Sequence, residues 1–360
     1  MRIRSFAPGK VILFGEHYVV YGAPGLVAAI GPDNEMEMEG VKVAAGAGGF
    51  EYQSTIKENN VALDCPVPPA AAAGPGAPGA DPSFAAGRPH PYAALYLEHA
   101  RRCPALQKLR IRARVKKAWP LKGVGNSASL GACLGAGLRE LGGEKSSHAL
   151  IFEDAQAADE VAHGGRPSGI DAAAASYGGV LQFEKDFATP LKPKISQLKM
   201  APMRGVQFLL IDTLEMGEER AGTGGLVARF ARAHGISRKP GEIKGGERQS
   251  VIDAYLPLFL HARRALEEGD WKVAGLLMDE NHKMLAEKGV SCPRIEKAVA
   301  LCKSFGALGA KLSGAGGPGG VVVAPVEKEK NAGVSEALAV EGFGRYSFEV
   351  EKKGAYARRE

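Results

Sequence analysis

The sequence predicts a mixed α+β protein of two domains, and three observations lead to this prediction. Its 360 residues suit two domains of roughly 100–200 residues each. Its hydrophobic fraction of 45% and charged fraction of 24% are globular values, which excludes a disordered chain and a coiled coil. Segments with the strand period of two residues alternate with segments of helical period. We place the domain boundary between residues 190 and 191, in a stretch rich in lysine and proline.

The N-terminal half is predicted to combine strands and helices. Leu109–Val115 alternates apolar with basic residues, as a strand does when its second face is solvated. Glu35–Val43 also alternates and suggests a hairpin. The proline-, alanine- and glycine-rich residues 66–82 are predicted to form a surface loop. The other predicted elements are a strand at Val11–Phe14, extended residues Val19 and Val20, and helices at Tyr92–Arg101, Ser127–Leu141 and Ser147–Ala162.

The C-terminal half is predicted to be mainly helical, with short strands around a glycine loop. Val206–Asp212 is a continuous apolar run and predicts a buried strand. Ala310–Ser313 and Val321–Val323 are predicted strands on either side of the glycine loop. The remaining predictions are helices at about Gly224–His234, Glu247–Gly269, Trp271–Glu287 and Pro293–Phe305, and a last strand at Phe348–Val350.

Composition also limits where the protein acts. The net charge of +6 suits anionic ligands but is too diffuse to indicate nucleic acid. The chain has no run of ~18 apolar residues, and Gly15–His17 interrupts the first apolar stretch before a signal-peptide core. Its 5 cysteines form no CxxC pair and predict reduced thiols. We therefore expect a cytoplasmic protein that binds neither nucleic acid nor membrane.

Several common catalytic motifs are missing. The sequence contains no GxxxxGK[ST], no HExxH, and no HRD or DFG segment, which excludes a P-loop enzyme, a zincin and a protein kinase. Residues 125–129 approach the GxSxG elbow, but Ser129 replaces its last glycine. Gly314–Gly319 satisfies GxGxxG, yet an apolar strand follows it where a dinucleotide fold needs a helix.

The loop Lys122–Ser129 is better placed to bind an anion. It lies between a predicted strand and a predicted helix, so its backbone N–H groups and the helix dipole favour a phosphate. Ser127 could offer its hydroxyl to a magnesium ion on that phosphate. The alternative is that Ser127 only caps the helix.

Two acidic residues further along the chain are candidates for the same chemistry. Glu160 lies on the predicted helix Ser147–Ala162 and could complete a magnesium site, although a solvated surface carboxylate is the simpler interpretation. Asp171 precedes four alanines, and its sequence context also fits a helix N-cap.

Four segments together resemble the motifs of the GHMP kinase family, and in particular of its mevalonate kinases. Residues 7–22 resemble the first motif and residues 122–129 the phosphate-binding motif GLGSSAA. Residues 165–171 resemble the stretch HGxPSGxD, with His163 one position early, and residues 311–320 resemble KLTGAGGGGC. The resemblance covers nearly the whole chain. It implies a ribosomal protein S5 domain 2-like N-terminal domain at 1–190 and a ferredoxin-like C-terminal domain at 191–360.

The resemblance also implies roles for individual residues. Asp171 matches the catalytic aspartate, and Lys10 matches a lysine near the reacting hydroxyl. Ser127 and Glu160 match the two magnesium ligands, Glu160 because it lies eleven residues before Asp171. The implied substrate contacts are Glu16, His17 and Thr223. The implied ATP-phosphate contacts are Lys122, Gly123, Val124, Gly125, Asn126, Ser127, Ala128 and Ser129, with Gly314, Ala315 and Gly316 from the third motif.

The implied activity is ATP-dependent phosphorylation of the C5 hydroxyl of (R)-mevalonate, a step of isoprenoid biosynthesis. Its cofactor is Mg²⁺, its partners are the small molecules mevalonate and ATP, and a homodimer is left open. Another small-molecule kinase of the family, such as phosphomevalonate kinase or a sugar kinase, is the nearest alternative. A nucleotide-binding sensor without catalysis is an alternative from a different class.

Three residues depart from the family motifs. Asn126 replaces the first serine of the GSS triplet, where its amide could still bind phosphate. Gly320 replaces a terminal cysteine, which we interpret as a packing difference. Pro318 interrupts the third glycine loop and removes one N–H donor.

Overall fold

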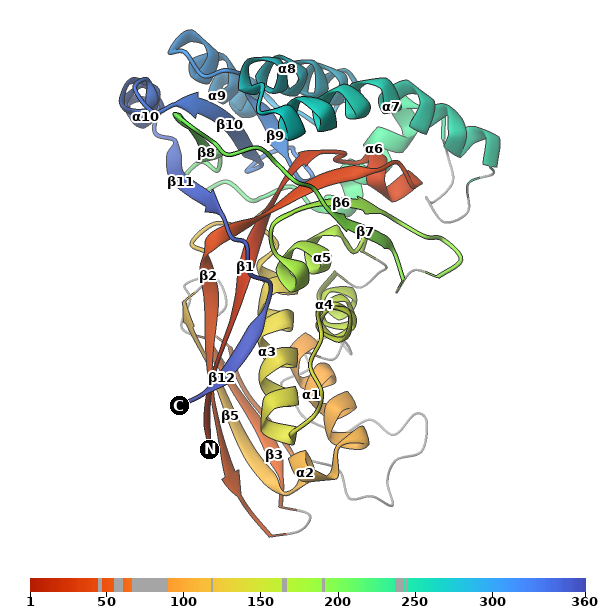
Figure 1. Ribbon diagram of the computed structural model, residues 1–360, viewed down its shortest axis with the longest axis vertical. Helices are drawn as coiled ribbons and strands as arrows, with labels where there is room; N and C mark the ends of the chain where they lie inside the picture. The colour runs from red at the N-terminus through yellow and green to blue at the C-terminus, as the bar shows by residue number, and fades with distance from the viewer. Residues whose placement is uncertain are drawn as a thin grey trace. The chain divides into compact units, whose positions relative to one another are not determined.

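The computed structural model describes residues 1–44, 47–54, 90–117, 119–163, 167–189, 192–236, 243 and 245–360, and the backbone of 61–66. Its backbone contacts define two compact units (Figure 1). Unit 1 comprises residues 1–9, 32–178 and 353–360, and unit 2 comprises residues 10–31 and 179–352. The strands β1 (Arg2–Phe14) and β2 (Gly25–Lys42) contribute to both units. The domain boundary at 190/191 stays a prediction.

Unit 1 contains a strand, Leu109–Lys117, that buries one face and exposes the other. In this unit the strand order is β4 (Val61–Pro66), β3 (Gly49–Ser54), β5 (Leu109–Lys117) and the second half of β2. The strand β5 runs antiparallel to β2 and parallel to β3, and β12 (Tyr356–Arg359) pairs with β1. Arg110 and Arg112 donate to the Glu51 carboxylate at 2.6 and 2.8 Å. The predicted polar face of β5 is therefore confirmed.

The helices of unit 1 lie on one side of its strands (Figure 1). They are α1 (Pro91–Arg102), α2 (Pro104–Gln107), α3 (Asn126–Gly142), α4 (His148–His163) and α5 (Ile170–Tyr177). Glycines in α3 let α4 approach closely: a Cβ on Gly131 would lie 2.7 Å from the Ala158 Cβ. At Gly135 it would lie 2.6 Å from the Asp154 Cβ. This approach brings the α4 side chains against the start of α3.

A buried charged network fixes these helices. Asp154 of α4 accepts hydrogen bonds from Arg139 of α3 at 2.8 Å and from His99 of α1 at 3.0 Å. Burial alone would raise the pKa of Asp154, but the hydrogen bonds from His99 and Arg139 outweigh it and lower that pKa. A buried carboxylate with two cationic or N–H partners is held in one place, so α1, α3 and α4 keep a fixed register.

Unit 2 has its own strands and helices. Its strand order is β7 (Lys194–Gln197), β6 (Val180–Glu184), the first half of β2, β11 (Gly344–Val350), β8 (Val206–Asp212), β10 (Val321–Glu327) and β9 (Lys311–Ser313). Its helices are α6 (Thr223–Ala233), α7 (Gly245–Glu268), α8 (Trp271–Glu287), α9 (Pro293–Ser304) and α10 (Asn331–Val340). The predicted helices and strands of the C-terminal half are thus confirmed, with shifts of a few residues. Phe348–Val350 belongs to β11 but is not the last strand, because β12 follows it.

Two predictions for the N-terminal half are wrong. Val19 and Val20 do not resume a strand but belong to the 3-10 helix η1 (Tyr18–Tyr21), which ends at Gly22 with φ 91°. Glu35–Val43 is not a hairpin: Glu35–Lys42 is the last part of β2, which pairs with the distant β5. Alternation reports that one face is buried and cannot identify the partner strand. Residues 67–82 of the predicted surface loop lie outside the described residues. Among the described helices, none has the length and apolar character to cross a membrane.

Candidate active site

The predicted phosphate-binding loop of unit 1, Lys122–Ser129, is held by asparagine side chains. The helix α3 starts at Asn126, after Gly125 at φ 74°. The Asn126 amide donates to the carbonyls of Trp119 and Leu121, both at 3.1 Å. The fully buried Asn34 donates to Asn126 Oδ1 at 3.2 Å and accepts from Trp119 N at 2.8 Å. Asn126 therefore closes the loop with its side chain, and any contact with phosphate falls to its backbone N–H.

Ser127 faces a carboxylate and does not cap its helix. It is the second residue of α3, and its hydroxyl donates to Asp159 Oδ1 at 2.6 Å. Asp159 is 3% exposed, and His163 Nε2 lies 3.3 Å from the same carboxylate oxygen. Glu160, the sequence-based candidate, is the next residue of α4 and is half-buried. The structure therefore brings Ser127 together with Asp159, which the sequence interpretation missed.

Ser127 and Asp159 fit a magnesium ion in the chemistry of their donors. Both present oxygen atoms, which Mg²⁺ prefers, and magnesium bound with nucleotides usually takes only one or two protein ligands. Among the described residues, no group of three His, Cys, Asp or Glu side chains is arranged to hold a metal. The remaining ligands would be phosphate oxygens and water.

Asp171 lies at the start of another helix of unit 1. The N-cap of α5 is Gly169, with φ 92°, and the helix begins at Ile170. Asp171 is therefore in the first turn and is not the cap, which removes the structural alternative raised by its sequence context. A carboxylate in a first turn interacts favourably with the positive end of the helix dipole.

In unit 2, Lys10 lies in β1, and Glu16 and His17, two of the predicted substrate contacts, lie in a buried turn that follows this strand. Lys10, Glu16 and His17 are 4%, 1% and 5% exposed. Glu16 forms an ion pair with Lys311 of β9. Burial raises the pKa of Glu16 and lowers the pKa of Lys311, while the attraction between the two charges opposes both changes.

His17 has a strained backbone. With φ 62° and ψ −39°, it is the central residue of a γ-turn in which Tyr18 N donates to Glu16 O at 2.7 Å. Among the described residues it is the single non-glycine residue with positive φ. Its ring stacks on Phe230 of α6 with centroids 5.0 Å apart, and Nε2 donates to the Ala315 carbonyl at 2.9 Å. Its Nδ1 is thereby left as a buried acceptor, with no hydrogen-bond partner among the described residues.

The buried His17 ring should make folding sensitive to acid. Burial lowers the pKa of His17 from 6.5 to about 4. Between these values the unfolded chain binds a proton that the folded chain does not, so stability falls as the pH is lowered. From about pH 7.5 to about pH 5, this residue should remove about 2 kcal/mol from the free energy of unfolding.

Urea titrations at the two pH values check this expectation. The control is His17→Asn, which cannot titrate and tolerates positive φ. The wild type should lose about 2 kcal/mol more than the variant between the two pH values. Equal losses in both proteins would show that His17 is protonated in the folded state or accessible to water.

The glycine loop Gly314–Gly320 is held by hydrogen bonds within the loop and from other residues of unit 2. Gly320 N donates to Gly317 O at 2.9 Å, and Gly319 has φ 69°, as in a type II turn with Pro318 at its second position. Thr213 Oγ1 donates to Gly320 O at 2.8 Å, and Arg220 donates to Gly319 O. The proline therefore occupies a turn position that needs no N–H donor.

The other predicted residues of unit 2 lie around the same segments. Gly314 and Gly316 have φ 81° and 77°, and a Cβ on Gly316 would lie 2.2 Å from Val290 O. Thr223 is exposed in the first turn of α6, the helix whose Phe230 packs on His17. In unit 1, Lys122 is exposed in the predicted phosphate-binding loop.

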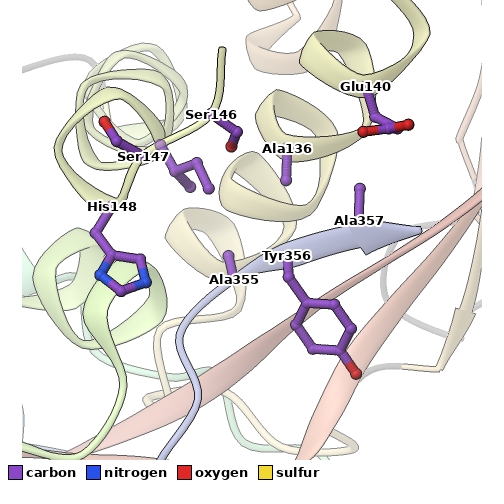
Figure 2. A pocket seen from close by; sticks show the side chains of 9 residues that line it. Ala136, Glu140, Ser146, Ser147, His148, Ala355, Tyr356 and Ala357 are labelled. Atoms are coloured by element: carbon purple, nitrogen blue, oxygen red, sulfur yellow. The ribbon is translucent and has the colours of Figure 1, made fainter.

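A separate hollow in unit 1 is not part of this chemistry. Figure 2 shows that it lies between the last turns of α3, the start of α4 and β12. Its lining includes Glu140, His148 and Tyr356. No predicted site residue lines it, because Ser127 is at the opposite end of α3.

Comparison with known proteins identifies the family. Residues 91–179 match the model of the GHMP kinases N terminal domain, and residues 262–341 match that of the GHMP kinases C terminal. A mevalonate kinase of Aeropyrum pernix is 30% identical over 98% of this chain and 97% of its own length. One from Thermococcus gammatolerans is 27% identical over 98% of both chains.

Solved structures show the same fold. The crystal structure of L. major mevalonate kinase in complex with R-mevalonate superposes with a TM-score of 0.72 at 24% identity, covering 98% of this chain and 96% of that one. The Methanococcus jannaschii mevalonate kinase gives a TM-score of 0.72 at 20% identity, covering 97% and 98%. The predicted α+β, two-domain GHMP kinase fold is confirmed. The chain belongs to the GHMP kinase family and, within it, to the mevalonate kinases.

Proposed function

We propose that this enzyme transfers the γ-phosphoryl group of ATP to the C5 hydroxyl of (R)-mevalonate in isoprenoid biosynthesis, with Mg²⁺ as cofactor. The observation that carries the proposal is the near full-length similarity to the mevalonate kinase of Aeropyrum pernix. In the present chain, residues 7–22, which resemble the first motif of the family, also contain the buried turn of Glu16 and His17. A protein with both features is expected to bind a small anionic alcohol beside a nucleotide.

The residues of this chain have separate tasks in the proposed reaction. The backbone N–H groups of the Lys122–Ser129 loop and the start of α3 bind the phosphates. Asp171 accepts the proton of the attacking hydroxyl, and Lys10 stabilises the negative charge that develops there. Ser127 and Asp159 would hold the metal, with Glu160 as the sequence-based alternative. Magnesium, when bound, supplies charge neutralisation on the phosphate oxygens.

The substrate contacts lie in unit 2. His17 presents Nδ1 as an acceptor, because its Nε2 proton is committed to Ala315. Such a nitrogen can accept a hydrogen bond from a substrate hydroxyl. Glu16 shapes the same turn, and Thr223 presents a hydroxyl from α6. Phosphoryl transfer depends on positioning, so a rigid buried turn suits it.

A coupled assay of ADP release tests the proposal. The purified enzyme is given ATP, magnesium and, separately, mevalonate, phosphomevalonate or galactose. We expect turnover with mevalonate and at least about 100-fold lower kcat/KM with the others, since a misfitted substrate loses the aligned hydroxyl. Preference for phosphomevalonate or galactose would assign another kinase of the family. ATP binding without turnover on any substrate would favour a sensor.

Replacing Pro318 should affect stability more than ATP use. In Pro318→Gly the turn gains freedom in the unfolded chain, which costs about 0.4–1 kcal/mol and lowers the melting temperature by about 1–3 °C. The KM for ATP should change less than about threefold, because the second position of this turn needs no N–H group. Thermal melts and ATP titrations check both effects. A tenfold lower KM for ATP in the variant would instead show that the missing donor limits phosphate binding.

A further inference from the structure

Three side-chain links join the first motif to the third motif inside unit 2. Lys311 of β9 forms an ion pair with Glu16. Ser313 Oγ accepts from Ile12 N at 3.0 Å and donates to Ile12 O at 3.1 Å. His17 Nε2 donates to Ala315 O at 2.9 Å. The turn that contains Glu16 and His17, here called the substrate turn, is therefore attached to β9 and to the glycine loop that follows β9, about 300 residues away in sequence.

Lys311 is the most unusual of these residues. Its side chain is completely buried, although lysine is almost never buried unless it is paired. The ammonium donates to the Glu16 carboxylate and to Leu312 O at 2.7 Å. The second carboxylate oxygen of Glu16 is also buried and has no hydrogen-bond partner among the described residues. One carboxylate oxygen of Glu16 is thus fixed by Lys311, and the other remains available as a hydrogen-bond acceptor.

Stability alone does not explain this pair. Desolvation of two buried charges offsets most of their attraction, and apolar residues of similar volume often stabilise a protein more. The ion pair does, however, fix the position of Glu16, the residue that precedes His17. The γ-turn at His17 is strained, and such conformations persist only where the surrounding contacts determine them.

We propose that Lys311 is a positioning residue for the substrate turn. By holding the Glu16 carboxylate, it fixes the γ-turn and with it the direction in which His17 presents Nδ1. This inference rests on the proposed function, in which Glu16 and His17 contact mevalonate. The glycine loop has its own anchors in Thr213 and Arg220, so loss of Lys311 should disturb mevalonate binding more than ATP binding.

Steady-state kinetics of Lys311→Met test the proposal, with Lys194→Met as the control. Lys194 also pairs with a glutamate of unit 2, Glu184 at 3.1 Å, but is exposed. We expect the KM for mevalonate to rise at least tenfold in Lys311→Met, the KM for ATP to change less than threefold, and both constants to stay unchanged in the control. A lower melting temperature with both KM values unchanged would leave Lys311 a purely structural role and overturn the proposal.

Glu16→Gln examines the same link from its other end. It keeps the volume of the side chain, so it should fold even where Lys311→Met does not. The proposal requires it to raise the KM for mevalonate in the same way. It also requires the double variant Lys311→Met/Glu16→Gln to be no worse than the poorer single variant, because the two residues act through one contact. Wild-type KM in Glu16→Gln, or additive effects in the double variant, would overturn it.

Amide hydrogen exchange without substrate separates this proposal from the proposed function. The N–H groups of Tyr18 and Val19, which bond to Glu16 O and Gly15 O, report on the turn. They should exchange at least tenfold faster in Lys311→Met and not in Lys194→Met. If the wild type does not phosphorylate mevalonate but these amides respond, the function fails and the positioning role stands. Unchanged exchange would refute the positioning role whatever the substrate.

Discussion

Replacing Asp171 with asparagine is expected to lower kcat by about 10²–10⁴-fold and to leave ATP binding intact. The expected loss is that of a general base, since an amide cannot accept the hydroxyl proton. The structure strengthens this test, because Gly169 and not Asp171 caps α5. Asparagine has nearly the same volume, so it should preserve the first turn of the helix.

Glu247→Gln is the matched control for Asp171→Asn. Glu247 is an exposed carboxylate in the first turn of α7 and has no proposed part in the reaction. Both variants lose one charge near a helix N-terminus, which costs typically about 0.3–1 kcal/mol of stability. Kinetics and nucleotide titrations should therefore separate them, with kcat reduced only in Asp171→Asn. A well-folded Asp171→Asn enzyme with wild-type kcat would leave Asp171 no role in proton transfer.

Local sequence patterns predicted most of the helices because each carries its own signals. Trp271–Glu287 matches α8 at both ends, where Asp270 accepts from Val273 N as an N-cap. The glycine loop before Val321–Val323 was correctly separated from a dinucleotide fold, because β10 follows it. These elements depend on periodicity and capping, which act within a few residues.

Contacts between distant segments could not be predicted in this way. The strand β6 begins at Val180, close to the region assigned to a boundary, and its strand character depends on pairing with β2. His17 has a positive φ, which only a few per cent of non-glycine residues adopt, so a local pattern does not predict its turn. Asn34 carried no local signal, and Lys311 was noted only as the first residue of the segment that resembles KLTGAGGGGC. Each works through a partner at least 85 residues away in the chain. Only the three-dimensional structure identifies them.

The choice between Asp159 and Glu160 shows where a resemblance can shift by one residue. In the family stretch, the histidine lies seven residues before the aspartate and the magnesium ligand lies eleven before it. The ligand is therefore four residues before the histidine. Here His163 lies eight residues before Asp171, so counting from Asp171 gives Glu160 and counting from His163 gives Asp159. The extra residue between His163 and Asp171 was the signal that could have identified Asp159.

The structure favours the count from the histidine. Asp159 is buried and accepts a 2.6 Å hydrogen bond from Ser127, whereas Glu160 is half-buried one position further along α4. Successive helical residues point about 100° apart, so only one of the two can face the start of α3. We therefore expect the magnesium requirement to depend on Asp159 and Ser127.

Asp159→Asn should raise the magnesium concentration for half-maximal rate by at least about 100-fold. A metal ligand that loses its charge should cost no less than the 10–100-fold typical of an outer-shell partner. Ser127→Ala removes a neutral oxygen ligand and should raise this magnesium concentration by about tenfold. Glu160→Gln should raise it by less than threefold. Asparagine can still accept the Ser127 hydrogen bond through Oδ1, so Asp159→Asn should keep the fold of this region.

The measurement is a magnesium titration of each variant, at saturating ATP and mevalonate. The same titration is followed independently of turnover by the magnesium-dependent rise in melting temperature in the presence of ADP, since a bound ligand stabilises the folded state by mass action. Asp159 and Glu160 are neighbouring carboxylates on α4, so each of the two variants is the control for the other. If Glu160→Gln raises the requirement and Asp159→Asn does not, the count from Asp171 was correct. Asp159 would then serve only to hold the Ser127 hydroxyl at the start of α3.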